Sequence, residues 1–298
     1  MVLTFDVGGT FVKWALADGE EFVQRGKFPT PQGSFDQLVE AVQSVWDALD
    51  TVPDGMAFSV PGTVDVANGI IRQGGALQYN TGIVFAPLLV ERFGVPVTVE
   101  NDARCAAYAE LASGALCGVN EALVVVVGTG IGGVVISGGE VLRDAHGSAG
   151  ELSLIPTRPI RANGMDAFLG SHVGMRPLLV RAAGELGETA ISGERLMELV
   201  RGGDPHANAV LDEALDELTD ALFGLQMAFD PEVIAIGGGI SADSTYVDRL
   251  ASKYEELFVT FPLPVQHARI VACVHRNDAN LLGALATYHK WVEAYKRK

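Results

Sequence analysis

Basic residues and cysteines are scarce in this sequence. Its 298 residues include 21 Lys or Arg and 37 Asp or Glu, so the formal net charge is −16. Nucleic-acid binding depends on clustered Lys and Arg, and the longest basic cluster here is residues 296–298. Cys105, Cys117 and Cys273 form no CxxC pair and are odd in number, which fits reduced thiols better than a disulfide framework. The composition therefore argues against a nucleic-acid partner and against redox chemistry.

A long apolar run and an export signal are also missing. Residues 1–6 contain neither a basic segment nor an extended apolar one. The most apolar stretch, residues 123–127, runs into glycines well short of the roughly 20 residues that a membrane helix needs. We therefore expect a cytoplasmic protein without a membrane partner. The apolar fraction of 48% excludes a disordered chain and supports a large core, which we expect to be divided into two lobes.

Short apolar runs and glycine turns predict an α/β chain. Residues 2–5, 11–16 and 22–28 are β-type runs separated by glycine turns, so the chain is expected to open as a strand meander. Ser34 and Gln37 form a capping box before a helical pattern. Further strands are expected at residues 55–60, 96–99, 122–127, 134–136 and 233–236, and further helices at residues 86–93, 101–112, 207–229 and 279–295.

One internal repeat bears on the architecture. At an offset of 120 residues, the glycine-turn hairpin of residues 8–16 matches residues 128–136, and Gly19-Glu20 matches Gly139-Glu140. Two such hairpins, one in each half, suggest a duplicated lobe whose turns face each other across a cleft. The alternative is chance similarity between two hairpins in a glycine-rich protein. We place a small α/β lobe at residues 1–115, completed by the C-terminal helix 279–298, and a large α/β lobe at residues 116–278.

The glycine clusters favour phosphate binding over a dinucleotide site. Gly128, Gly130 and Gly133 satisfy GxGxxG, but a Rossmann loop must lead into a helix. Residues 134–139 are β-branched and then turn, which is typical of a hairpin. The sequence also lacks GxxxxGK[ST], which excludes a P-loop. What is left is a loop whose bare backbone amides can approach phosphate oxygens.

Other motifs allow a functional and a structural interpretation. Asp6 lies at a strand end beside glycine amides and Thr10, which suits Mg²⁺ and a terminal phosphate, or else simply closes a tight turn. Residues 237–239 could lie against a purine or ribose, or form an ordinary strand-to-helix turn. Asn101 and Asp102 start a helix, where Asp102 is either a cap or a general base. The six histidines have no zinc-ligand spacing.

Taken together and in order, these motifs resemble the ROK family of sugar kinases and sugar-responsive proteins. The resemblance covers nearly the whole chain. Residues 5–13 and 127–133 resemble the two phosphate motifs of the family, and residues 234–241 resemble its adenosine-side glycines. Residues 99–107 resemble the segment with the catalytic aspartate, which falls on Asp102. The resemblance implies an α/β, two-lobed, actin-like ATPase (ribonuclease H-like) fold with a duplicated β-sheet core and an interlobe cleft.

The family resemblance also implies a reaction and a set of site residues. We expect an ATP-dependent sugar kinase that transfers the γ-phosphoryl group of Mg·ATP to a hydroxyl, the primary 6-hydroxyl, of a hexose-like sugar, with Asp102 as general base. Asp6 is expected to place Mg²⁺, directly or through water, and the protein to be a homodimer. The expected nucleotide contacts are Asp6, Gly8, Gly9, Thr10, Lys13, Gly128, Thr129, Gly130, Gly132, Gly237, Gly238 and Gly239. The expected sugar contacts are Gly62, Asp65, Asn80, Asn101, Asp102, Glu151 and Asp166.

Two departures from the family pattern concern zinc and the sugar. Relatives with a structural zinc have a CxCGxxGCxE segment and a His three residues after the Glu of an Ala-Gly-Glu motif. Here that position is Leu154, and residues 159–168 contain no cysteine, so no zinc site is expected. Asp166 stands in for the Glu that reaches the sugar in relatives. The repressor branch, which carries an N-terminal helix-turn-helix, is not expected because the chain begins inside the first phosphate motif.

A second function remains open at this point, namely a catalytically silent sugar sensor of the same fold. Retention of Asp102 and of both phosphate loops favours the kinase, since a sensor needs no base beside a triphosphate. The residues leave open which sugar is used, whether it is a monosaccharide, a disaccharide or a phosphorylated sugar, and whether ATP or polyphosphate is the donor.

Overall fold

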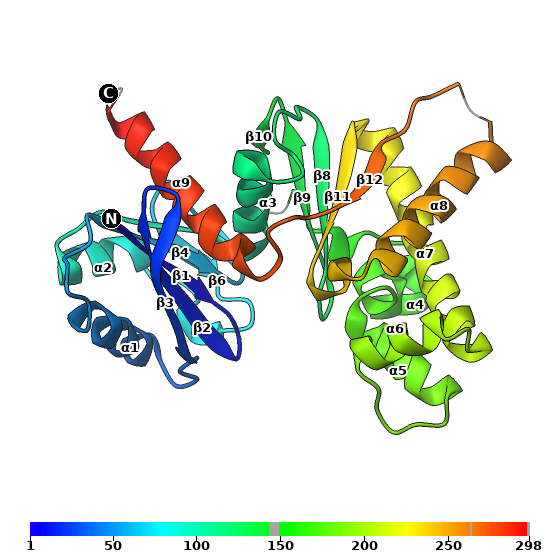
Figure 1. Cartoon of the computed structure of the whole chain (residues 1–298), viewed down its shortest axis with the longest axis horizontal. Coiled ribbons are helices and arrows are strands. Elements are labelled where there is room, and N and C mark those ends of the chain that lie inside the picture. Colours follow the sequence, from blue (N-terminus) through cyan, green and yellow to red (C-terminus); the bar gives the residue numbers. More distant parts are fainter. Residues whose placement is uncertain (143–148, 263, 297–298) are drawn as a thin grey trace. The chain divides into compact units, whose positions relative to one another are not determined.

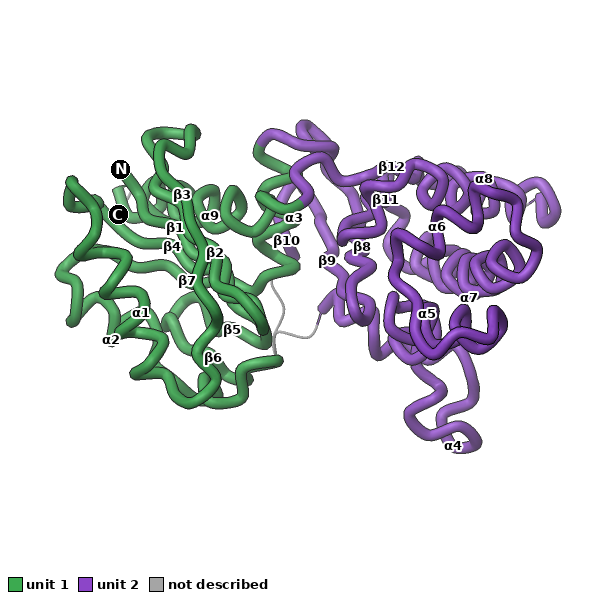
Figure 2. The backbone as a smooth tube through the Cα atoms, turned by 60° about the horizontal axis from the view of Figure 1, so that its bottom comes forward, with its two compact units in different colours: residues 1–112, 143–148, 277–298 green, residues 113–142, 149–276 purple. Residues whose placement is uncertain are grey.

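The computed structural model describes residues 1–142, 149–262 and 264–296. These residues form two compact units (Figure 2). One unit contains residues 1–112 and 277–296, and the other contains residues 113–142 and 149–276 apart from residue 263. Each unit is an α/β structure built on one five-stranded sheet.

The first unit is a mixed sheet with helices on both faces (Figure 1). Its strands are β1 (Val2–Val7), β2 (Phe11–Asp18), β3 (Glu21–Pro29), β4 (Gly55–Val60) and β7 (Val97–Asn101), in the order β3-β2-β1-β4-β7. The first three strands form an antiparallel meander, and β4 and β7 run parallel to β1. The helices are α1 (Phe35–Asp47), α2 (Phe85–Phe93), α3 (Asp102–Ser113) and α9 (Ala279–Lys296). A small hairpin, β5 (Thr63–Asp65) and β6 (Ile70–Gln73), follows β4.

Aromatic contacts attach α2 to one face of this sheet, and α9 packs closely on the other face. Phe5 stacks on Phe58, with ring centroids 4.8 Å apart, and Phe85 of α2 meets Phe58 edge-on at 5.1 Å. On the other face α9 packs on β1, β4 and β7. At Gly283 of α9 a Cβ atom would lie 1.7 Å from the carbonyl oxygen of Cys105. Only glycine allows this approach, so α9 lies directly against α3.

The second unit repeats the same sheet. Its strands are β8 (Ala122–Val127), β9 (Ile131–Ser137), β10 (Glu140–Val141), β11 (Val233–Gly237) and β12 (Arg269–Ala272), in the order β10-β9-β8-β11-β12. Again the first three strands are antiparallel and the last two run parallel to the central one. The helices are α4 (Ile160–Asn163), α5 (Met175–Glu185), α6 (Gly193–Arg201), α7 (Pro205–Phe229) and α8 (Ser244–Thr260). The main core lies where α5, α6, α7 and α8 cover the sheet.

The duplication predicted from the 120-residue offset is confirmed by this topology. Strand order and strand directions are the same in both sheets. The two hairpins differ in one detail, because Val7 pairs with Val12 whereas Val127 pairs with Ile131. The second turn is therefore one residue shorter than the first, which gives the two glycine turns different backbone shapes.

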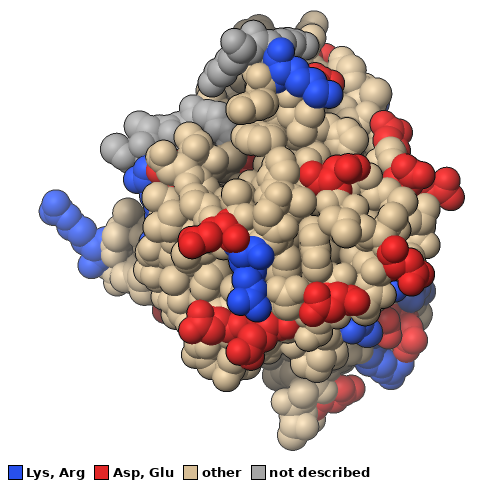
Figure 3. Space-filling model, turned by 90° about the vertical axis from the view of Figure 1, so that its left-hand side faces the viewer, with Lys and Arg blue, Asp and Glu red and all other residues tan. Residues whose placement is uncertain are grey.

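Surface charge and helix hydropathy agree with the composition. Figure 3 shows acidic and basic side chains interspersed over one face of the molecule, with no continuous basic area among the atoms drawn in colour. Within the described ranges, none of the helices combines enough length with enough apolar character to cross a bilayer.

Candidate functional site

The carboxylate of Asp6 is held by groups from two other elements of the first unit. Asp6 is 7% exposed at the end of β1. Its Oδ1 accepts a hydrogen bond from Nδ2 of Asn280 at 2.9 Å, and its Oδ2 lies 3.5 Å from Nζ of Lys13 on the paired strand β2. Asn280 lies on α9, 274 residues away along the chain. Sequence reasoning missed Asn280 because no local pattern links it to Asp6.

The turn that follows Asp6 presents two amides to solvent. The N–H of Gly8 donates to the carbonyl of Phe11 at 3.1 Å, so it is used inside the turn. Two side chains that follow β3 hold the carbonyl groups of the turn. Thr30 Oγ1 donates to the Gly8 carbonyl at 2.7 Å, and Gln32 Nε2 donates to the Gly9 carbonyl at 2.9 Å. Gly9 and Thr10 are exposed, and within the described chain their N–H groups bond to no other residue. These two amides are therefore available to donate hydrogen bonds to an anion.

Asn101 and Asp102 lie where β7 passes into α3. Asn101 Nδ2 donates to the Gly62 carbonyl at 2.8 Å and to Asp102 Oδ1 at 3.0 Å. Asp102 Oδ1 also accepts from the N–H of Ala103 at 2.8 Å, and Asn101 Oδ1 accepts from the N–H of Arg104 at 3.1 Å. These bonds orient the half-buried Asp102 carboxylate and tie the loop after β4 to the end of β7. The structure thus brings Gly62, Asn101 and Asp102 together.

Gly62 is required at its position by close backbone contact. Its φ is +94°, and a Cβ atom there would lie 2.0 Å from the carbonyl oxygen of Gln73. A side chain at this position would push apart the loops that follow β4 and β6. Gly62 therefore supports the site through its backbone, with its carbonyl fixing Asn101.

The side chain of Asn80 is buried in the first unit. Asn80 is 1% exposed, in a 3₁₀ turn, Gln78–Asn80. Both its Oδ1 and its Nδ2 lack a partner within the described structure. Such groups are rare in proteins, because each costs about 1–3 kcal/mol when left unsatisfied. Among the described residues this amide keeps an unused donor and an unused acceptor, which are able to bind hydroxyl groups.

Asp65 is engaged within its own hairpin. Its Oδ2 lies 2.7 Å from Nη2 of Arg72 and accepts from Nδ2 of Asn68 at 3.1 Å. The hydrogen bond from Asn68, followed by that from Arg72, lowers the pKa of Asp65. The carboxylate therefore closes the β5–β6 hairpin, and the structure gives it no bond to Asn101 or Asp102.

The second glycine turn rests on the start of α5. The carbonyls of Gly128 and Thr129 accept from the N–H groups of Met175 and Arg176 at 2.9 and 3.1 Å. A Cβ atom on Gly174 would lie 2.7 Å from Cα of Gly130. At Gly128 and Gly130, in contrast, an added Cβ atom would meet no atom of the described residues within 4 Å, their chain neighbours aside. The turn is thus anchored on one side and open on the other.

The glycines after β11 lie beside the end of β8. Gly238 has φ +90°, and a Cβ atom there would lie 2.1 Å from the Val127 carbonyl oxygen. Ser241 Oγ donates to the Gly238 carbonyl at 2.8 Å, which closes the turn. Gly132 and Gly237 lie within strands β9 and β11, and both pair with Val126 of β8.

A cavity of about 1180 Å³ joins these two motifs in the second unit. Gly128, Thr129 and Gly239 line it together with α5, α6 and the segment of residues 188–194. Its apolar wall comes from residues that sequence reasoning did not single out, namely Met175, Leu179, Ile191, Met197 and Ile240. A glycine turn at one end and an apolar wall beside it suit a nucleoside phosphate.

These features agree with comparisons to known proteins. A model of the ROK family matches residues 2–290. The chain belongs to the ROK family. Beta-glucoside kinases of Klebsiella pneumoniae and Listeria monocytogenes are 29% and 30% identical to it, each covering 97% of this chain, and the matches span 95% and 96% of those proteins. A ROK family protein of Streptococcus pneumoniae in complex with sucrose superposes with a TM-score of 0.88 at 26% identity, covering 100% of this chain and 99% of that one. The fold is the actin-like ATPase fold of these ROK proteins.

Glu151 and Asp166 are the two expected sugar contacts that lie in the second unit of this ROK protein. Glu151 is exposed in a segment that Gly133 holds tightly, since a Cβ on Gly133 would lie 2.1 Å from Cγ of Leu152. The side chain of Asp166 is also exposed. The backbone carbonyl of Asp166 accepts a hydrogen bond from Nε2 of His172 at 2.5 Å. Within the described ranges, no group of three or more His, Cys, Asp or Glu side chains is arranged to hold a metal.

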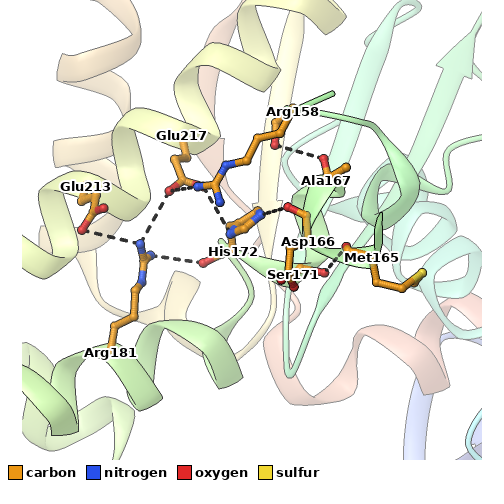
Figure 4. A network of polar contacts seen from close by, with 10 residues as sticks. Arg158, Met165, Asp166, Ala167, Ser171, His172, Arg181, Glu213 and Glu217 are labelled. Atoms are coloured by element: carbon orange, nitrogen blue, oxygen red, sulfur yellow. Dashed lines mark hydrogen bonds and ion pairs between the residues drawn. The ribbon is translucent and has the colours of Figure 1, made fainter. Parts of the chain in front are cut away.

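An ion-pair network holds this region of the ROK chain (Figure 4). Glu217 of α7 lies at its centre, with Arg158 Nη2 at 3.2 Å, Arg181 Nη1 at 3.6 Å and His172 Nδ1 at 3.9 Å. Arg181 also donates to the His172 carbonyl at 3.2 Å. The network links the segment around Asp166 to α5 and α7. Charged side chains therefore anchor this segment, in which residues 159–168 contain no cysteine.

Proposed function

We propose that this ROK protein is a sugar kinase that transfers the γ-phosphoryl group of Mg·ATP to the primary hydroxyl of a hexose-like sugar. The observation that carries the proposal is the Asp102 carboxylate, oriented by Asn101 and by the helix start at the end of β7. The similarity to two beta-glucoside kinases over nearly the whole chain supports it and makes a β-glucoside the first substrate to test.

The sugar would be bound by polar groups of the first unit. Asn80 offers a buried amide whose donor and acceptor have no protein partner within the described residues, and sugar hydroxyls can satisfy both. Asn101 and Asp102 would bind the reacting end of the sugar, and the backbone of Gly62 supports them. Asp65, Glu151 and Asp166 complete the proposed set of sugar contacts.

Asp102 would act as the general base. A carboxylate that accepts the proton of the attacking hydroxyl raises the nucleophilicity of that oxygen as the phosphoryl group moves in line. The bonds from Ala103 N–H and Asn101 Nδ2 hold Oδ1 in one direction. This prior orientation lowers the entropic cost of reaching the transition state.

The phosphate groups would be bound by the two glycine turns. Gly9 and Thr10 of the first turn have exposed amides, and Gly128 and Gly130 of the second have open space beside them. The proposal assigns the triphosphate of the donor to the amides of these turns, which can donate hydrogen bonds to its oxygens.

Asp6 fits a magnesium ion bound through water. A carboxylate oxygen is the ligand type that Mg²⁺ prefers, and the Asp6 side chain is 11% exposed. When bound, the ion neutralises negative charge on the phosphates. Lys13 and Asn280 would keep the Asp6 carboxylate in place. A homodimer and a cytoplasmic location belong to the same proposal, and light scattering of the purified chain tests the first.

A coupled assay of ADP release over glucose, β-glucosides, mannose, N-acetylmannosamine and disaccharides tests the reaction. Asp102→Asn is expected to lower turnover by about 10²-fold to 10⁴-fold while sugar affinity, measured by calorimetry, stays near that of the wild type. Asp36→Asn is the matched control, because Asp36 is an exposed acid in the first turn of α1. Full activity of Asp102→Asn refutes the assignment of the base, and sugar binding without phosphoryl transfer by the wild type supports the sensor instead.

A further inference from the structure

The cavity in the second unit is lined by several acidic side chains and a single basic one. Glu188, Glu194 and Asp243 contribute carboxylates, and Arg176 is the one Lys or Arg among its described lining residues. A nucleoside triphosphate in this cavity would bring several negative charges close to these carboxylates. A cation near the glycine turn would offset part of that repulsion.

The backbone places Arg176 directly beside the phosphate turn. Arg176 is the second residue of α5, and its N–H donates to the carbonyl of Thr129 at 3.1 Å. Its side chain is exposed and lines the same cavity as Gly128 and Thr129. The position of its Cα relative to the turn is therefore determined by a hydrogen bond.

Arg176 has no ion-pair partner in the described structure, unlike Arg181 and Arg201. Arg181, further along α5, pairs with Glu213 and Glu217. Arg201 pairs with Asp243 on the cavity wall. The guanidinium of Arg176 is thus available to an external anion.

A cation at this place is unfavourable for the helix itself. The N-terminus of a helix carries partial positive charge, which repels a basic side chain in the first turn. The first turn of α5 contains no acidic residue that would offset Arg176. A bound anion would reverse this penalty, because both the guanidinium and the helix end attract it.

We infer that Arg176 is the cation that binds the phosphate groups of the nucleoside triphosphate in this cavity. The inference rests on the proposed function in one respect, namely that the cavity holds the nucleotide. The planar guanidinium can donate two parallel hydrogen bonds to phosphate oxygens. Arg176 acts in binding the donor and takes no part in proton transfer.

Calorimetric titration of Mg·ATP and of adenosine in the absence of sugar tests the inference. Arg176→Gln is expected to weaken Mg·ATP binding by roughly 10-fold to 100-fold, the range for a hydrogen bond to a charged group. Adenosine affinity should change less than about 2-fold, because adenosine has no phosphate. Arg176→Lys keeps the positive charge but loses the two parallel guanidinium donors, so its loss of Mg·ATP affinity should be intermediate. Arg269→Gln, which removes an exposed arginine of β12 that does not line the cavity, is the matched control.

Thermal melting separates binding from a structural role. Because Arg176 opposes the helix dipole, Arg176→Gln is expected to melt at the wild-type temperature or slightly above it. A lower melting temperature, an equal loss of ATP and adenosine affinity, or unchanged ATP affinity would each overturn the inference. If the wild type binds neither ligand, the nucleotide assignment of the cavity fails as well, which distinguishes failure of the proposed function from failure at Arg176 alone.

Discussion

Two buried amides with equal exposure should respond in opposite ways to an apolar substitution. Asn80 and Gln226 are each 1% exposed. Neither the Oδ1 nor the Nδ2 of Asn80 has a partner in the described structure. Gln226 Oε1 accepts from Tyr254 Oη at 3.0 Å and from the Ala268 N–H at 2.9 Å, and Gln226 Nε2 donates to Asp230 Oδ1 at 3.0 Å. The pair therefore isolates the effect of hydrogen bonding from that of burial.

The magnitudes follow from counting the groups left unsatisfied. Asn80→Leu removes two unpaired polar groups and leaves none behind, so at about 1–3 kcal/mol for each group we expect the free energy of unfolding to rise by about 2–6 kcal/mol. Gln226→Met keeps a similar volume but leaves the buried Tyr254 hydroxyl and Ala268 N–H without an acceptor. At about 1–3 kcal/mol for each of these two groups, the expected loss is about 2–6 kcal/mol.

Urea denaturation with two probes measures these changes. Far-UV circular dichroism reports on both units, and tryptophan fluorescence reports on the first, since Trp14, Trp46 and Trp291 all lie there. Calorimetry then gives the sugar affinity of Asn80→Leu, which is expected to fall even though the protein is more stable. A variant at position 80 that is destabilised as much as Gln226→Met would refute the argument about unsatisfied groups. Unchanged sugar affinity would remove Asn80 from the proposed site.

Two further predictions concern glycine and cysteine. Gly238→Ala is expected to destabilise the second unit, because Gly238 has φ +90° and a Cβ there would lie 2.1 Å from the Val127 carbonyl oxygen. Gly128→Ala should leave the melting temperature unchanged and weaken ATP binding, because a Cβ there would meet no described atom within 4 Å. Equal melting temperatures of the two variants would contradict the steric argument. Burial raises the pKa of the Cys105 thiol, so the folded state holds the thiol proton more tightly than the unfolded state. This difference stabilises the fold fully below the unfolded pKa of about 8.5. The stabilisation should be lost as pH rises from there towards the raised pKa of the folded state. Mass spectrometry after iodoacetamide treatment at pH 8 should find the exposed Cys117 alkylated and Cys105 intact; rapid alkylation of Cys105 in the folded protein would contradict this.

Local sequence patterns predicted much of the secondary structure. The capping box is confirmed, as Ser34 Oγ accepts from the Gln37 N–H at the start of α1. Gly94 ends α2 in the left-handed conformation, and the strand expected at residues 55–60 is β4. Sequence reasoning missed α5, α6, α8 and β12, whose apolar positions are interrupted by polar residues or are few. The apolar wall of the cavity lies largely on these missed helices, and it was therefore not predicted.

The site shows where sequence reasoning reached its limit. The Asp6 turn and the Asn101-Asp102 pair were found because a strand end, a glycine turn and a polar helix start are adjacent in the chain. Nothing adjacent to Asp6 points to Asn280, and nothing near residue 166 points to Glu217 of α7. Such partners become neighbours only when helices pack on a sheet.

The sequence by itself determined the repeated hairpins, the main helix caps and the family, because turns, periodicity and motif spacing depend on neighbours within a few residues. Tertiary structure alone decided the strand order, the one-residue difference between the two turns, the buried amide of Asn80 and the cavity beside Arg176. These features arise from packing between segments far apart in the chain, where sterics and desolvation act on atoms that no local pattern brings together.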